Sequence, residues 1–135
     1  MKNQIQKMLE EYRSNLEPQN VVTALIVEPG KAPYVQKIGS DYQSLFCLLG
    51  GPIEGFTLNF DGVDILCNEY GKVLGLPSNR AILDSMEEPC DIIAGTFIVI
   101  GARAEDEEYS SLTEEEINKY YELFKDPVCR WRYVL

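Results

Sequence analysis

The strongest hydrophobic pattern in the chain is a pair of nearly continuous apolar runs. These are Val21-Val-Thr-Ala-Leu-Ile-Val27 and Ile92-Ile-Ala-Gly-Thr-Phe-Ile-Val-Ile100, both rich in β-branched residues. Such runs are typical of strands that are buried on both faces. We therefore expect two central strands. A Pro- and Gly-containing loop at residues 28–33 should follow the first strand, and Tyr34–Ile38 then alternates as a short edge strand.

Helical spacing predicts an amphipathic helix at the start of the chain and a second one in its middle. Apolar residues recur on one face of Lys2–Leu16, and Pro18 should end that helix. We assign residues 1–19 to this N-terminal helix, which could pack on the domain or form an oligomer contact. The second helix should begin at a capping box, Ser40-Asp-Tyr-Gln43, and end at Gly50-Gly51, which supplies a left-handed residue.

A third helix is predicted by a second capping box, Thr113-Glu-Glu-Glu116, with Leu112 and Ile117 placed as its hydrophobic staple. The three glutamates fall in the first turn, where the helix dipole favours negative charge. Ile117, Tyr121 and Phe124 should form the buried stripe. Pro127 should then end the helix.

Between these helices, Asp61-Gly62 is typical of a two-residue type I′ turn of a β-hairpin. That turn would place Phe60 opposite Val63 and Phe56 opposite Cys67, with Thr57 and Asp64 on the other face. Shorter returning strands could follow at Lys72–Leu74 and Cys129–Leu135. The sequence thus predicts a single α+β domain over residues 20–135, with a mixed or mainly antiparallel β-sheet and about three helices.

Composition agrees with one globular domain and narrows its setting. Of the 135 residues, 45% are apolar and 25% are charged, which argues against disorder. No apolar run reaches the roughly 18 residues that a membrane span needs. The polar N-terminus does not resemble a signal peptide. We therefore expect a cytoplasmic protein without a membrane partner.

The chain has no histidine, and its four cysteines are scattered. The lack of histidine excludes Ser-His-Asp and Cys-His catalytic arrangements and removes the commonest metal ligand. Cys47, Cys67, Cys90 and Cys129 show no metal-type spacing, so we expect reduced and mostly packed thiols. The sequence thus predicts no catalytic residues of these classes, no metal site and no cofactor.

The formal net charge is −10, from 12 basic and 22 acidic residues. Direct binding to nucleic acid is disfavoured, because that binding depends on clustered Lys and Arg. Two interpretations of the acidic surface stay open. It serves solubility alone, or it imitates nucleic acid towards a basic partner.

The candidate site is a turn-rich stretch that holds isolated positive charges. Between Lys37 and Arg103 the only basic residues are Lys72 and Arg80, both within Tyr70-Gly-Lys-Val-Leu-Gly-Leu-Pro-Ser-Asn-Arg80. Loops on a rigid scaffold carry function more often than the scaffold itself. This stretch is therefore where we look for a ligand.

Ser78 or Asn79 could cap a short helix running to about Leu83, whose free N–H groups would attract an anion. Arg80 would then lie in the first turn, where the dipole disfavours a cation unless an anion is near. The predicted ligand-binding set adds two lysines and a tyrosine able to stack on a planar ligand. The full set is Arg80, Asn79, Ser78, Lys72, Tyr70 and Lys31.

The simpler alternative is that the stretch is only a turn. Arg80 would then pair with Asp84 at i+4 or with Glu69, as many exposed charges do. No phosphate-binding G-x-x-x-x-G-K-[ST] or G-x-G-x-x-G motif is present.

Several motifs together resemble one known family. They are Val27-Glu-Pro-Gly-Lys-Ala-Pro-Tyr34, Leu45–Gly51 with Ile53-Glu54, Cys67-Asn-Glu-Tyr-Gly-Lys72, Gly75-Leu-Pro-Ser-Asn-Arg80 and Asp91-Ile-Ile-Ala-Gly-Thr-Phe97. The chain resembles domain-of-unknown-function family 3846 over residues 21–125. The resemblance implies a small accessory protein of phages, plasmids and integrative elements in a bacterial host cell. It supplies no catalytic residues.

Three functional hypotheses follow. The first is a non-enzymatic, counter-defence protein that binds an anionic small molecule, such as a nucleotide immune signal, as a homo-oligomer closing over the ligand. The second is an acidic inhibitor of a host defence protein, whose face of Glu105–Glu108 and Glu114–Glu116 imitates DNA. The third is an enzyme that uses Tyr, Lys or carboxylates.

Overall fold

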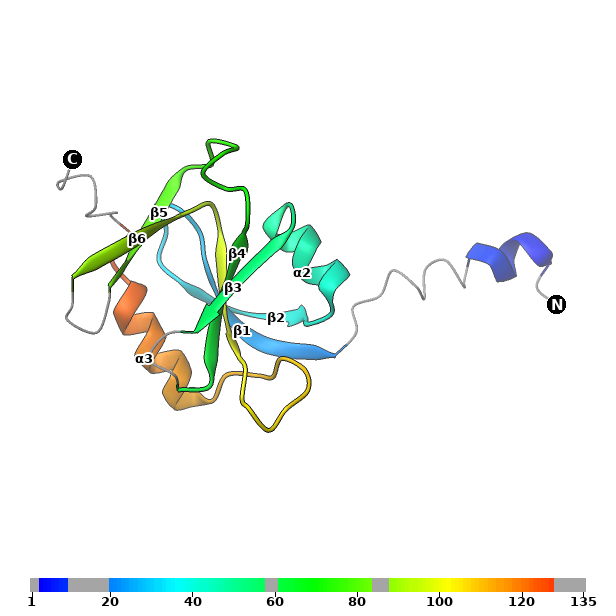
Figure 1. The fold of residues 1–135 in the computed structure, drawn as a ribbon. Coiled ribbons are helices and arrows are strands. Elements are labelled where there is room, and N and C mark those ends of the chain that lie inside the picture. Colours follow the sequence, from blue (N-terminus) through cyan, green and yellow to red (C-terminus); the bar gives the residue numbers. More distant parts are fainter. Residues whose placement is uncertain (1–2, 10–19, 58–60, 84–87, 128–135) are drawn as a thin grey trace.

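Two antiparallel sheets organise the protein in the computed structural model, which describes residues 3–9, 20–57, 61–83 and 88–127. A five-stranded sheet has the order β2-β1-β7-β4-β3, and a separate ribbon pairs β5 with β6 (Figure 1). A short helical segment at residues 4–9 precedes them. The predicted α+β fold is confirmed. The elements are β1 (Val21–Val27), β2 (Tyr34–Gly39), α2 (Tyr42–Leu49), β3 (Ile53–Thr57), β4 (Val63–Asn68), β5 (Ser78–Leu83), β6 (Pro89–Ala94), β7 (Phe97–Gly101) and α3 (Glu114–Phe124).

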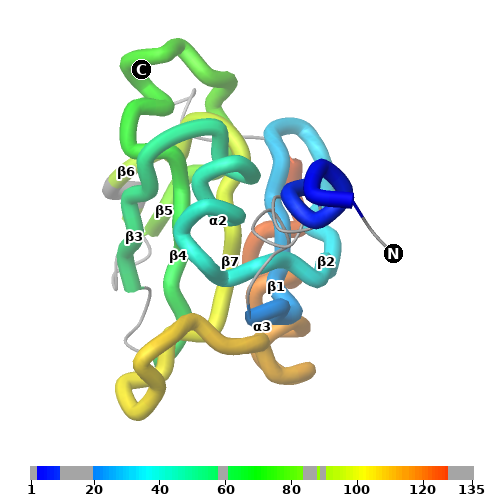
Figure 2. The backbone as a smooth tube through the Cα atoms, turned by 90° about the vertical axis from the view of Figure 1, so that its right-hand side faces the viewer, coloured from blue at the N-terminus to red at the C-terminus, as the bar shows by residue number. Residues whose placement is uncertain are grey.

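Both faces of the five-stranded sheet are covered. Helix α2 packs on one face, where Leu45 joins a cluster with Ile26 and Ile98. Helix α3 and the β5–β6 ribbon pack on the other, where Phe124 and Ile93 join a second cluster. Figures 1 and 2 show α2 and α3 on opposite sides of the sheet. Because β1 and β7 lie inside this sandwich, they carry the continuous apolar runs of the sequence.

The first predicted strand and its edge neighbour are confirmed. β1 spans Val21–Val27 and pairs with β2 on one side and β7 on the other. β2 lies at the edge of the sheet, and most of its side chains are exposed. The Pro- and Gly-containing segment between them forms the predicted loop.

The second apolar run is two strands rather than the predicted one. β6 ends at Ala94 and β7 begins at Phe97, and the two belong to different sheets. Gly95 separates them with φ +85°, a backbone conformation that a side chain disfavours. A Cβ atom at Gly95 would also lie 2.8 Å from Cδ1 of Leu76. A single glycine inside an apolar run therefore marks a change of sheet.

The predicted hairpin is present, but its register is different. Phe56 pairs with Ile65, and Thr57 pairs with Asp64. The sequence predicted that Phe56 would pair with Cys67. The predicted two-residue turn at Asp61-Gly62 is therefore wrong, and the connection between β3 and β4 is longer than two residues. Because the difference is two positions, the described side chains keep their predicted faces, and the predicted pairing of Phe60 with Val63 lies outside the described residues. The Thr57 hydroxyl donates to Asp64 Oδ1 at 2.7 Å on the face expected for both.

Helix α2 begins one residue later than the predicted capping box. Asp41 is the N-cap, and its side chain accepts from the Ser44 amide at 3.1 Å. The predicted cap, Ser40, instead donates from Oγ to the Asn20 carbonyl at 2.8 Å, so its hydroxyl joins β1 to the start of the helix. The predicted end is confirmed, because Gly50 has the left-handed conformation with φ +78°.

Helix α3 begins at the predicted capping box, with reciprocal bonds between Thr113 and Glu116. Its buried stripe contains Tyr120 and Phe124, whereas the predicted Tyr121 is 38% exposed. The Tyr120 hydroxyl donates to Asp61 at 2.6 Å. Asp61 thus connects α3 to the β3–β4 connection rather than shaping a tight turn.

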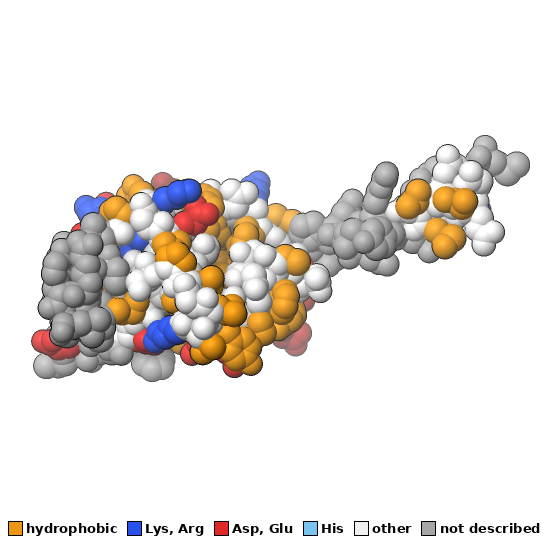
Figure 3. All heavy atoms as spheres, turned by 90° about the horizontal axis from the view of Figure 1, so that it is seen from above, with side chains coloured by type: hydrophobic (Ala, Val, Ile, Leu, Met, Phe, Trp, Pro, Cys, Tyr) orange, Lys and Arg blue, Asp and Glu red, His pale blue; other side chains and the backbone are white. Residues whose placement is uncertain are grey.

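Three further predictions concern the ends of the chain and the segment after β4. Residues 69–75 form turns, so the predicted strand at Lys72–Leu74 is wrong. The N-terminal helix is present at residues 4–9, with hydrophobic side chains on its surface (Figure 3). Its predicted continuation to Leu16, and the predicted edge strand at Cys129–Leu135, lie outside the described residues.

Candidate functional site

The predicted short helix at Ser78–Leu83 is wrong. These residues form β5, which pairs with β6 in an antiparallel ribbon. The pairing register shifts between Ser78 and Arg80, so Asn79 forms a bulge. Both Asn79 and Arg80 are buried, in successive positions. The anion site expected at a helix start therefore has no helix to provide it.

Asn79 is fully buried and bonds to two backbone segments. Its side-chain Nδ2 donates to the carbonyl oxygens of Val27 and Gly95, each at 2.8 Å. Val27 ends β1, and Gly95 separates β6 from β7. Asn79 thus connects the β5–β6 ribbon to the large sheet at the point where the chain changes sheet.

Arg80 is only 4% exposed, and its guanidinium group bonds to the preceding residue and to two other chain segments. Nε donates to the Phe124 carbonyl at 3.0 Å, Nη1 to Asn79 Oδ1 at 2.7 Å and Nη2 to the Lys31 carbonyl at 2.6 Å. Phe124 is the last residue of α3, where carbonyl groups lack intrahelical partners and the dipole is negative. The predicted electrostatic setting is therefore reversed, because Arg80 lies at the favourable end of a helix.

The two predicted lysines have contacts of their own. Lys31 meets Arg80 through its backbone carbonyl, while its Nζ lies 3.6 Å from Glu28. Lys72 forms an ion pair with Asp91 of β6.

Two further members of the predicted set are exposed: Tyr70 at 49% of its surface, and Ser78 at the start of β5. Binding of an anion by the six residues stays a prediction.

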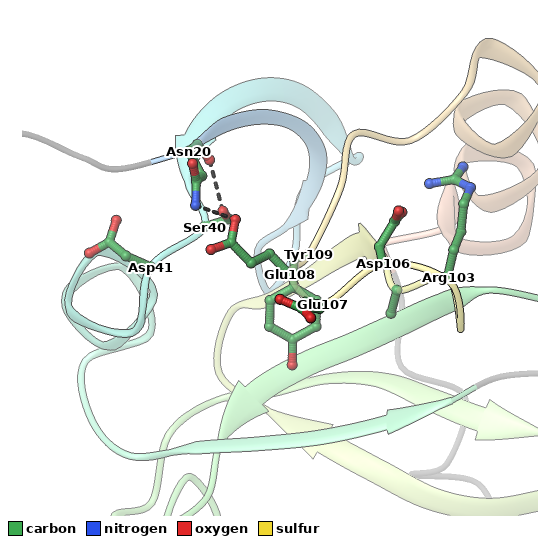
Figure 4. A pocket seen from close by; sticks show the side chains of 9 residues that line it. Asn20, Ser40, Asp41, Arg103, Asp106, Glu107, Glu108 and Tyr109 are labelled. Atoms are coloured by element: carbon green, nitrogen blue, oxygen red, sulfur yellow. Dashed lines mark hydrogen bonds between the residues drawn. The ribbon is translucent and has the colours of Figure 1, made fainter.

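A different feature, a hollow with acidic walls, lies at the opposite end of β1 from Asn79. It has a volume of about 750 Å³ and combines the start of β1, the β2–α2 junction and the segment after β7 (Figure 4). We call it the acidic hollow. It is lined by Asn20, Ser40, Asp41, Ala102, Arg103, Asp106, Glu107, Glu108 and Tyr109.

Hydrogen bonds hold one wall of the acidic hollow in place. Asn20 Nδ2 donates to Glu108, which joins the segment after β7 to the start of β1. Asp41 caps α2, as described above, so its carboxylate is oriented by the helix. Asp106 and Glu107 are exposed. Figure 4 shows Asp41 and Arg103 at opposite sides of the hollow, with Glu107 and Glu108 between them.

The lining cation of the acidic hollow is engaged elsewhere. Arg103 donates from Nη2 to Glu116 at 2.5 Å and from Nη1 to Ser110 Oγ at 2.6 Å. Its charge is therefore balanced at the first turn of α3. The hollow is lined by four carboxylates and one guanidinium group, so its lining suits a cationic group and not an anion.

The sequence predicted the acidic segment of this lining but not the hollow. Glu105–Glu108, which the sequence placed on an acidic face, are exposed. The sequence did not predict that Asn20 and Asp41 would line this hollow. Asn20, for example, lies 88 positions from its partner Glu108. Only a known strand order could have indicated that pairing.

Among the described residues, no cluster of three or more His, Cys, Asp or Glu side chains is arranged to hold a metal ion. Cys47 is a free, exposed thiol and Cys67 a free, buried one. No helix within the described ranges is long and apolar enough to cross a membrane.

Comparison with known protein families matches residues 22–125 to the family described as Domain of unknown function (DUF3846). The match confirms the resemblance predicted from the sequence motifs. No curated protein and no solved structure matches the chain.

Proposed function

Because the chain belongs to the DUF3846 family, whose function is unknown, we propose a function from the geometry of its surface. The protein is a non-enzymatic binding protein that presents the acidic hollow to a basic surface of another protein. The observation that carries this proposal is the concentration of four carboxylates around one wide hollow whose lining arginine is already paired.

Electrostatics favours such an encounter. The chain has a formal net charge of −10, so the field of the whole molecule adds to the local field of the hollow. Complementary charge raises association rates and disfavours wrong partners more than it raises affinity. A concave site lined by one sign of charge focuses that field on an approaching cation.

Anion capture, the first of the two binding hypotheses, has less support. It depended on Asn79 and Arg80, whose side chains are buried and bonded to protein atoms. It also depended on Lys72, which is paired with Asp91. A protein partner for the acidic hollow needs no such rearrangement.

The resemblance to accessory proteins of mobile elements gives the partner a class. In that setting the proposed partner is a host defence protein whose basic surface binds nucleic acid. The acidic hollow would then occupy a surface that DNA uses, and duplex DNA would compete for the same partner.

The test is a pull-down from bacterial host lysate with the wild-type chain and a charge-reversal variant, Asp106→Lys/Glu107→Lys. Both residues are exposed, and the described residues show no side-chain bond from either. Glu116 is unsuitable, because Thr113 and Arg103 both bond to it. Captured proteins should be lost from the variant, and they should elute from the wild type with rising salt.

Glu115→Lys/Glu122→Lys is the matched control, since both residues are exposed on α3, neither lines the acidic hollow, and the change in net charge is the same. It should capture the same partners as the wild type. Equal capture by the Asp106→Lys/Glu107→Lys variant, or capture that is insensitive to both salt and DNA, would exclude the acidic hollow as the binding surface.

A further inference from the structure

A second cavity lies between the large sheet and the β5–β6 ribbon, with a volume of about 340 Å³. We call it the cleft. Its size is at the small end of the range of about 300–1,000 Å³ that is usual for ligand pockets. The walls come from β3 and β4 on one side and from the ribbon on the other. Its apolar lining is formed by Phe56, Cys67, Ile82, Ile92, Ile93 and Ala94.

The rim of the cleft carries three carboxylates and one ammonium group. Glu54 lies on β3, Glu69 follows β4, and Asp91 lies on β6. Lys72 neutralises Asp91 by forming an ion pair with it. Among the described residues, the side chains of Glu54 and Glu69 have neither a hydrogen bond nor an ion pair. The rim therefore keeps an excess of negative charge next to an apolar floor.

The thiol of Cys67 lies on the floor of the cleft, near the carboxylates of Glu54 and Asp91. Burial raises the pKa of its thiol to about 11, and the nearby Glu54 and Asp91 carboxylates add to that increase. The group is thus a neutral thiol at physiological pH, which makes it a packing residue and not a nucleophile. The carboxylates of Glu54 and Asp91 and the ammonium group of Lys72 all lie within electrostatic range of this thiol.

We propose that the cleft binds a small organic cation, with a short apolar body against Phe56 and Ile93 and an ammonium group between Glu54 and Glu69. The apolar floor removes the body of such a ligand from water. The two carboxylates attract its charge. An anion of the same shape would meet their repulsion, and Lys72 would have to leave Asp91 to bind it.

This site is separate from the acidic hollow in both residues and chemistry. No residue lines both cavities. The hollow is bordered mainly by polar side chains and suits a protein surface, whereas the cleft has an apolar floor and the volume of a small molecule. The two proposals can therefore fail independently.

The test uses three probes with the same phenyl body: 2-phenylethylamine, 2-phenylethanol and 3-phenylpropanoate. Each is titrated into the isotopically labelled protein, and backbone amide shifts in two-dimensional NMR spectra are followed. The amine should shift the amides of Cys67, Ile92 and Ile93. It should bind at least about fivefold more tightly than the alcohol, since two partly exposed carboxylates each contribute a modest attraction. The carboxylate should not shift these amides.

Two variants assign the preference to the rim. Glu54→Gln/Glu69→Gln should lower the affinity for the amine by about fivefold and leave the alcohol unchanged. Glu114→Gln/Glu115→Gln removes two exposed carboxylates from the first turn of α3 and should behave as the wild type.

Three results would overturn the proposal. They are equal binding of all three probes, an unchanged amine affinity in Glu54→Gln/Glu69→Gln, and no shift of the cleft amides at millimolar amine. If the amine shifts only the amides of Asp106–Tyr109, the third of these results applies, and the acidic hollow is the binding site instead.

Discussion

The Nε atom of Arg80 donates to the carbonyl oxygen of Phe124 at 3.0 Å, which joins β5 to the last residue of α3. Two more bonds from the same guanidinium reach Asn79 and the Lys31 carbonyl. A planar group with donors in a fixed fork is suited to hold three segments at once. Arg80 is thus a structural centre of the domain.

Arg80→Ala should destabilise the domain strongly, because it leaves buried acceptors without their donors. We expect a loss of about 2–4 kcal/mol in the free energy of unfolding, measured in urea. Arg80→Lys should recover only part of that, since one ammonium group cannot reach the three acceptors. Lys72→Ala is the control, because its exposed ion pair should contribute less than about 1 kcal/mol. An Arg80→Ala variant as stable as Lys72→Ala would contradict the structural role.

Asn79→Ala should cost about 2 kcal/mol, because the Val27 and Gly95 carbonyls lose the donors that satisfy them. Asn79→Asp should cost more at neutral pH, since a carboxylate has no donor and would face two carbonyl oxygens. Thermal unfolding followed by circular dichroism measures both. Ser78→Ala, at the exposed neighbouring position, should change the stability little. The test is the order of the losses in stability, which should be largest for Asn79→Asp, smaller for Asn79→Ala and smallest for Ser78→Ala.

Gly95→Ala should destabilise the domain through both backbone strain and a steric clash. Its φ is +85°, and the new Cβ would lie 2.8 Å from Leu76 Cδ1. We expect a cost of about 2 kcal/mol, measured by urea unfolding. Gly30→Ala separates the two effects, because Gly30 has φ +74° but no atom within 4 Å of a new Cβ. Gly30→Ala should cost about 1 kcal/mol, from backbone strain alone. If Gly95→Ala cost no more than Gly30→Ala, the side chain of Leu76 would have moved to relieve the clash.

Asp61 should make the stability depend on acid. Burial would raise the pKa of its carboxyl, but hydrogen bonds from Lys119 and Tyr120 outweigh burial and hold it below the ordinary value of 3.8. A lowered folded-state pKa stabilises the protein above the unfolded pKa, and that stabilisation is lost as the pH falls through the folded value.

The difference in unfolding free energy between the wild type and Asp61→Asn should therefore shrink as the pH is lowered from neutral to below the ordinary carboxyl value of 3.8. Urea titrations at several pH values measure it. A difference that stays constant over this range would show that the carboxylate charge does not contribute.

Local signals predicted several elements correctly. The capping box at Thr113–Glu116 marked the start of α3, because both of its hydrogen bonds lie within four residues. Gly50 marked the end of α2 for a similar reason. The apolar runs marked β1 and β7, since a strand covered on both faces needs apolar residues throughout.

Signals that depend on distant partners led to the wrong predictions. Asp61-Gly62 suggested a tight turn, but the Asp61 carboxylate bonds to Lys119 and Tyr120 of α3, 58 and 59 positions away. Ser40 looked like a cap, yet its hydroxyl bonds to Asn20 across the start of the sheet. In each case a polar side chain that could have bonded to a nearby backbone group bonds instead to a residue far away in the sequence.

The sequence by itself determined the class of fold, the positions of the main strands and helices, the acidic character of the surface and the family. These properties follow from periodicity, capping and composition, which act over a few residues. The tertiary structure decided what Asn79 and Arg80 do. Their acceptors at Val27, Lys31 and Phe124 lie 44 to 52 positions from them, so only the packed sheets and α3 bring donors and carbonyls together. Burial then turned two candidate ligand residues into internal hydrogen-bond donors.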